Sequence, residues 1–214
     1  MCIRDRYRKE IDDGDTRCCW CCSSFIVIDE LFSTPIGFYN FNYDLLSIEK
    51  WCYSEMQKSD GRECSNSGGW QSNDYTGEDL ELTPLKQLCD GIRYSSAEFG
   101  RILGVRDRPE LVNLWVNINP KGCYNRVHVH PESRISGVFW VKSTNTGDSG
   151  TLVFMREDAY AIGTIAPIDT KYSINRQAYN PLTNLMLLFP SCVSHQVFPN
   201  LIDEDRISIS FNLV

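Results

Sequence analysis

Residues 113–119 read NLWVNIN, a stretch in which small apolar side chains alternate with tryptophan and asparagine. Leu114, Val116 and Ile118 fall on one face of a β-strand, and the tryptophan shares the other face with the asparagines. The same period of two returns at the end of the chain, which reads RISISFNLV from Arg206 onward. Both stretches predict strands with one face packed on an apolar core.

Further β-rich runs lie between these two strands. Residues 127–130 alternate, residues 136–142 and 150–155 are rich in β-formers, and residues 185–190 form a continuous apolar run. The polar residues 143–148 predict a hairpin connection between the second and third of these runs. Short strands joined by turns, with no helical pattern between them, are typical of an antiparallel sandwich or barrel.

Helical patterns occur only in the first half of the chain. Residues 44–57 space their apolar side chains as an amphipathic helix does. Thr83-Pro84 predicts the start of a second helix, because proline suits the first helical position. The buried stripe that we expect on this helix consists of Leu85, Leu88, Ile92 and Phe99.

Two other segments complete this half. Residues 26–37 are apolar and predict an opening strand, and residues 65–73 are too rich in Gly, Ser and Asn for regular structure. We therefore expect a single mostly β (α+β) domain over residues 26–214. Residues 26–110 would be its helical and mixed support, and residues 111–214 its β core.

The N-terminal segment does not share this patterning. It begins MCIRDR, which resembles the translation of an adapter used in preparing sequencing libraries. We expect residues 1–25 to be such an artefact or a disordered leader. The cluster CCWCC at Cys18–Cys22 would suit a metal-binding tract, but no histidine and no second CxxC pair lies near it.

Composition excludes several classes of protein. With 42% hydrophobic and 23% charged residues, the 214-residue chain is neither disordered nor fibrous. A net charge of −7 argues against nucleic acid as a partner. No apolar run approaches the roughly 18 residues of a membrane span. The cysteines form no framework and no secretory signal is visible, which favours a reduced, cytoplasmic protein.

The chain has three histidines, His128, His130 and His195. The first two are separated by one residue of a predicted strand, so both imidazoles project from the same face and can bind one ion. His195 follows the apolar run 185–190, where a sandwich would bring it opposite the pair. The three residues predict a metal site, and imidazole ligands suit iron, zinc, copper or nickel.

The last strand carries a second group of polar residues. Arg206, Ser208, Ser210 and Asn212 share one face by the period of two. If the aliphatic face packs on the core, this polar face lines a cavity, in which a guanidinium with a nearby hydroxyl suits a carboxylate. The alternative is an exposed face with Arg206 paired to an acidic residue at 203 or 204. Because His195 is close in sequence, we expect the metal ligand and Arg206 on adjacent strands.

These features resemble the prolyl-hydroxylase-like oxygenases that use Fe(II) and 2-oxoglutarate, and more closely a group of oxygenases common in marine phages and bacteria. The resemblance runs in order from about Leu31 to the C-terminus. It rests on five short segments: Gly68–Ser72, His128–Pro131, Ser136–Val141, Phe189–Ser191 and Arg206–Asn212.

The resemblance implies a double-stranded β-helix (jelly-roll) buttressed by the N-terminal helices. It also implies that His128 and His195 bind Fe(II) and that Arg206 and Ser208 bind the far carboxylate of 2-oxoglutarate. With O2 as the other cosubstrate, the implied reaction hydroxylates a C–H of a protein or peptide side chain or of a small molecule, and releases succinate and CO2.

One position departs from this family, because His130 stands where an Asp or Glu is usual. His130 can be the third ligand of a three-histidine site, or it can lie beside the metal without binding it. Alternatively the frame shifts, so that His130-Pro131-Glu132 supplies the ligands and His128 lies outside. We favour the pair His128 and His130. In all three interpretations His195 is a metal ligand.

Two competing interpretations remain open. Gly122 and the His-x-His pair match the start of a cupin metal motif, but Arg134 and Ile135 stand where its glutamate belongs. A cupin also leaves Arg206 and Ser208 without a role. A non-catalytic jelly-roll binding module would need neither a metal nor three convergent histidines.

Overall fold

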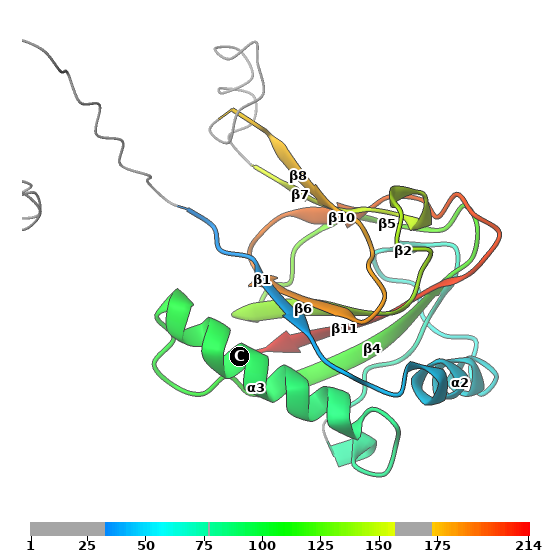
Figure 1. The fold of residues 1–214 in the computed structure, drawn as a ribbon, viewed down its shortest axis with the longest axis horizontal. Coiled ribbons are helices and arrows are strands. Elements are labelled where there is room, and N and C mark those ends of the chain that lie inside the picture. The colour runs from blue at the N-terminus through cyan, green and yellow to red at the C-terminus, as the bar shows by residue number, and fades with distance from the viewer. Residues whose placement is uncertain (1–32, 77, 157–172) are drawn as a thin grey trace, which may run out of the picture. The chain divides into compact units, whose positions relative to one another are not determined.

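From residue 111 onward the chain passes back and forth between two antiparallel sheets (Figure 1). The larger sheet has the order β1-β9-β6-β11-β4-β3 and the smaller one β2-β5-β10-β7-β8. The strands of the larger sheet are β1 (Gly37–Asn40), β3 (Trp70–Gln71), β4 (Leu111–Asn119), β6 (Ile135–Lys142), β9 (Leu185–Pro190) and β11 (Arg206–Leu213). Those of the smaller sheet are β2 (Asn66–Ser67), β5 (Tyr124–His128), β7 (Leu152–Met155), β8 (Arg176–Tyr179) and β10 (His195–Val197).

Strands β4 to β11 make two four-stranded layers, β9-β6-β11-β4 and β5-β10-β7-β8. This arrangement is the double-stranded β-helix, so the predicted mostly β fold with its jelly-roll is confirmed. The strands expected at residues 113–119, 136–142, 150–155, 185–190 and 206–214 are all present within one or two residues.

The computed structural model describes residues 33–76, 78–156 and 173–214. The predicted leader 1–25, with the cluster Cys18–Cys22, lies outside the described residues. So does most of the strand expected at residues 26–37, and β1 begins only at Gly37. The division of the chain at residue 25 therefore stays a prediction.

The two predicted helices are α2 (Leu45–Met56) and α3 (Lys86–Leu103), and short 3-10 turns occur at η1 (Glu78–Leu80) and η2 (Gly147–Ser149). Asp44 ends the segment before α2 and accepts a hydrogen bond from the Ser47 backbone N–H at 3.2 Å. Helix α3 begins just after the predicted Thr83-Pro84 and is followed by its C-cap Gly104, whose φ of 76° suits glycine. Neither helix combines the length and hydrophobicity needed to cross a membrane.

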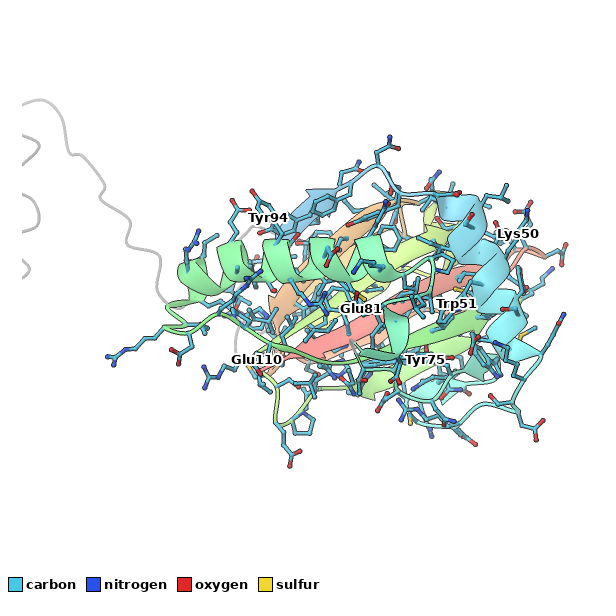
Figure 2. All side chains as sticks on the ribbon, turned by 90° about the horizontal axis from the view of Figure 1, so that it is seen from below. Lys50, Trp51, Tyr75, Glu81, Tyr94 and Glu110 are labelled. Atoms are coloured by element: carbon cyan, nitrogen blue, oxygen red, sulfur yellow. The ribbon has the colours of Figure 1, made fainter. Side chains whose placement is uncertain are left out.

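Both helices cover the outer face of the larger sheet (Figure 1). Leu85, Leu88, Ile92 and Phe99 are buried against this face, as the stripe predicted. Figure 2 shows α3 lying over the strands, with the exposed Tyr94 at the edge of the helix. A second, smaller apolar cluster lies between the sheets and contains Trp140, Leu152, Phe154, Leu187 and Phe189.

Two local predictions are wrong. Residues 143–148 do not close a hairpin, because β6 and β7 belong to different sheets. Both edges of β6 already pair with β9 and β11, which come from distant parts of the sequence. Residues 65–73 are not irregular throughout, since they contain β2 and β3. Gly68 and Gly69, with φ of 69° and 70°, carry the chain from one sheet to the other between these strands.

Candidate metal and cosubstrate site

The three histidines meet in the smaller sheet. His128 is the last residue of β5 and His195 the first of β10, and the two are register partners in the antiparallel β5–β10 pair. Their ring centroids are 4.3 Å apart. Cross-strand partners project from the same face of a sheet, so this pairing directs both rings to the same point.

His130 lies two residues beyond the end of β5. Its ring centroid is 5.1 Å from the rings of both His128 and His195. One nitrogen of each histidine lies within 4.8 Å of the others. Glu132 is exposed and does not belong to this group, so the geometry favours the pair His128 and His130 over the shifted frame.

Backbone carbonyls set the tautomers of two rings. Nδ1 of His128 lies 2.7 Å from the Arg126 carbonyl, and Nδ1 of His195 lies 2.9 Å from the Val193 carbonyl. Because a carbonyl only accepts, each Nδ1 carries the proton and donates. The Nε2 lone pair of each ring is therefore left for a metal, in the arrangement that orients most protein histidine ligands.

Burial keeps the three rings neutral. Burial lowers the pKa of His128 below its ordinary value. It also lowers the pKa of His130 to about 4, with a contribution from His128. For His195, burial first and then His128 lower the pKa to about 3. Neutral imidazole is the form that binds a metal, so the site is ready for an ion at neutral pH.

Arg206 is 1% exposed at the start of β11. Its Nη1 donates to the Ser149 and Gly150 carbonyls at 3.0 and 3.2 Å. Burial lowers its pKa to about 10, so the guanidinium remains charged at neutral pH. Among the described residues no Asp or Glu forms an ion pair with it, and Asp203 pairs with Lys121 instead. The exposed-strand alternative for Arg206 is thus wrong.

Gly150 makes this position of Arg206 possible. Its φ is 92°, and a Cβ there would overlap Nη1 of Arg206 and approach the Phe198 carbonyl at 2.5 Å. The η2 turn therefore needs glycine at this point, both for its backbone and for the space that the guanidinium fills.

One cavity between the sheets contains all five residues singled out from the sequence: His128, His130, His195, Arg206 and Ser208. Within the described part of the chain, no carboxylate side chain lines it. The relative positions of His195, His128 and Arg206 differ from the sequence prediction in two respects. His195 lies beside His128 in the same sheet, not opposite the pair, because it opens a strand of its own. Arg206 and His195 lie on facing sheets, not on adjacent strands, because β10 and β11 belong to different layers.

Several residues of the cavity wall were not predicted from the sequence, among them Trp115, Asn117, Asn125, Trp140 and Phe189. Trp115 and Asn117 lie on the face of β4 assigned to polar residues, and both are buried because this face looks into the cavity. Their alternation with Leu114 and Val116 was the sequence signal that they share one strand face. Which strand face lines a cavity depends on the second sheet.

A comparison of the sequence with curated proteins finds no match. Residues 113–212 match the model of a family described as "Putative 2OG-Fe(II) oxygenase". The core of this jelly-roll, residues 113–212, is similar to the 2OG-Fe(II) oxygenases. The oxygenase is accordingly an oxidoreductase, and Fe(II), 2-oxoglutarate and O2 are the cofactor and cosubstrates of its class.

Solved structures share the fold of the oxygenase at low sequence identity. A prolyl-4-hydroxylase from Pseudomonas putida is 13% identical, with a TM-score of 0.62 over 85% of this chain and 92% of that one. A Trichoplax adhaerens prolyl hydroxylase, solved with a peptide fragment of hypoxia inducible factor, is 12% identical, with a TM-score of 0.58 over 83% and 82%. HygX from Streptomyces hygroscopicus, with nickel and 2-oxoglutarate bound, is 10% identical, with a TM-score of 0.52 over 84% and 82%.

Proposed function

We propose that the oxygenase binds Fe(II) through His128, His130 and His195, binds 2-oxoglutarate through Arg206 and Ser208, and hydroxylates a C–H of a protein or peptide side chain. One observation carries this proposal. A buried guanidinium, which has no carboxylate partner among the residues that the structure describes, and three neutral, convergent imidazoles face the same cavity.

The histidines suit a divalent transition metal. Two of them present Nε2 lone pairs whose orientation is set from behind by backbone carbonyls, and His130 completes a group of three nitrogen donors. Three nitrogen ligands leave coordination positions for a bidentate cosubstrate and for oxygen. When bound, Fe(II) supplies the redox chemistry that couples oxidative decarboxylation of 2-oxoglutarate to oxidation of the substrate.

Arg206 and Ser208 suit a dicarboxylate. A charged group buried without a counter-ion is costly, and a bound carboxylate offsets that cost with charge-assisted hydrogen bonds. Ser208 lines the cavity on the same strand face as Arg206. Arg206 and Ser208 would bind the carboxylate at the far end of 2-oxoglutarate. The keto-acid end would then face the histidines.

The fold relatives support a protein or peptide substrate. The Pseudomonas putida and Trichoplax adhaerens structures are both prolyl hydroxylases, and the latter holds a peptide. The cavity wall near His130 is aromatic, with Trp115 and Phe189 at ring-centroid distances of 5.7 and 6.4 Å. Aromatic walls exclude water from a reacting C–H and pack well against a side chain such as proline. The cytoplasmic location and the phage or marine origin stay predictions.

The proposal is tested in two steps with purified protein loaded with Fe(II) without oxygen. After air is admitted, we expect slow conversion of 2-oxoglutarate to succinate even without a substrate, and loss of this conversion in Arg206→Ala at low 2-oxoglutarate. Peptide and small-molecule libraries are then screened for the mass gain of one oxygen atom. Iron-loaded protein that never consumes 2-oxoglutarate would contradict the proposal, and oxidation confined to small molecules would contradict its substrate class.

A further inference from the structure

Three residues far apart in the sequence form a buried polar cluster outside the group of histidines and the cavity wall. They are Ser136 of β6, Ser191 just after β9, and Asn212 of β11, and we call them the Ser-Ser-Asn cluster. Each belongs to one of the sequence segments on which the family resemblance rests. Both serines are 1% exposed, and Asn212 is 9% exposed.

The hydrogen bonds of the Ser-Ser-Asn cluster run in one direction. Ser136 Oγ lies 2.8 Å from both Ser191 Oγ and Asn212 Oδ1. An amide oxygen only accepts, so Ser136 donates to Asn212 and Ser191 donates to Ser136. The hydroxyl of Ser191 is therefore tied to two strands of the larger sheet, β6 and β11.

The backbone of Ser191 extends this link to the metal site. Its carbonyl accepts a hydrogen bond from the His130 N–H at 3.0 Å, and its own N–H donates to the Arg134 carbonyl at 3.1 Å. The two bonds enclose the turn at residues 131–133, which includes Glu132 with a φ of 69°. Ser191 thus joins His130 to the larger sheet.

His130 needs such a link more than the other two histidines do. His128 and His195 are placed by their register within the smaller sheet, but the β5 ladder ends at His128. His130 lies beyond it, so the distance from its ring to the others depends on how the two sheets are joined at this point.

We propose that the Ser-Ser-Asn cluster is a positioning device for His130, and that Ser136, Ser191 and Asn212 act on the metal only through it. This inference rests on the proposed function, because it takes His130 as a metal ligand. Partners that lie behind a metal ligand typically change metal affinity by about tenfold or more when they are removed. Replacing Ser191 with alanine removes the hydroxyl that links this residue to β6 and β11. The Ser191 carbonyl, and the His130 N–H that it accepts from, are then less restrained.

The test measures Co(II) binding to the apoprotein by titration, with the visible absorption of the bound ion as a second readout. Ser191→Ala is expected to weaken Co(II) binding about tenfold and to change the absorption bands that report the ligand geometry. Ser136→Ala breaks the same chain of hydrogen bonds and gives an independent variant if Ser191→Ala folds poorly. Ser95→Ala is the matched control, because Ser95 is a fully buried serine of α3 that donates to the Gly91 carbonyl away from the site.

A double-mutant cycle separates positioning from general destabilisation. In a His130→Ala background, Ser191→Ala should leave Co(II) affinity unchanged, because the residue through which it acts is gone. An equal loss in both backgrounds would overturn the inference, as would a Ser191→Ala protein with wild-type affinity and absorption. A wild-type protein that binds no Co(II) would instead overturn the proposed function itself.

Discussion

His195 is the direct cross-strand partner of His128, and their rings are 4.3 Å apart between centroids. This pairing is a property of the backbone ladder, so two of the three nitrogen donors are in place before any ion binds. Preorganised ligands of this kind lose little conformational entropy on binding.

His195→Ala should abolish stoichiometric metal binding. It removes a 4% exposed imidazole of the group and leaves two donors on one stretch of chain. Equilibrium dialysis with Fe(II) under nitrogen, followed by metal analysis, measures the effect. Gln196→Ala, at the next residue of β10, is the matched control and should keep full occupancy. Full occupancy in His195→Ala would mean that the metal lies elsewhere.

Comparing the Fe(II) affinities of His130→Ala and Glu132→Gln decides which of the two residues is the third metal ligand. Because Glu132 is exposed and outside the group of donors, Glu132→Gln should leave Fe(II) affinity within twofold, roughly the scatter of surface substitutions. His130→Ala should weaken it at least tenfold, because losing a ligand costs no less than losing one of the partners behind it, which typically costs about tenfold or more. The reverse ranking, measured in the same dialysis, would restore the shifted frame.

Arg206→Ala should raise the 2-oxoglutarate concentration needed for half-maximal succinate formation by about a hundredfold, the cost of one buried charge-assisted contact. Metal binding should not change, since Arg206 contacts none of the histidines through a hydrogen bond. Ser208→Ala should have a smaller effect in the same direction, and the exposed Arg134→Ala none. Loss of metal and cosubstrate binding together would show that Arg206 is structural.

Gly150→Ala should reproduce the Arg206→Ala defect without touching the guanidinium. The new Cβ would occupy the space of Nη1 and would require a backbone conformation that alanine disfavours. Isothermal titration with 2-oxoglutarate and bound Co(II) tests this. The control is Gly147→Ala in the same turn, where an added methyl group would lie 3.4 Å from its nearest neighbours. Wild-type affinity in Gly150→Ala would contradict the assigned role of the turn.

Metal-free protein should lose stability as the pH falls from 7 to 5. The folded-state pKa of His130 is about 4, below the ordinary 6.5, so the unfolded chain binds the proton first and acid favours unfolding. For this residue the loss is about 2 kcal/mol. Urea unfolding at both pH values should show a loss smaller by that amount in His130→Gln than in the wild type. Identical losses would mean that His130 is not buried as a neutral ring.

The patterns of single elements were predictable because they depend on local chemistry. The alternation at residues 113–119 and 206–212 indicates strands whatever their partners in the fold. Asp44 caps the start of α2 by accepting a hydrogen bond from Ser47, three residues away. The spacing of His128 and His130 likewise implied two imidazoles on one side of the chain. The hairpin at residues 143–148 failed because polar turn residues say nothing about which sheet the next strand joins.

The sequence by itself determined five of the jelly-roll strands, the two helices, and the three histidines, Arg206 and Ser208 as residues of one site, because periodicity and residue chemistry can be followed along the chain. Only the tertiary structure decided that His195 lies beside His128, that Arg206 faces them from the other sheet, and that Ser191 joins His130 to that sheet. These relations arise from strand pairing and sheet packing between residues far apart in sequence. Local patterns carry no information about such distances.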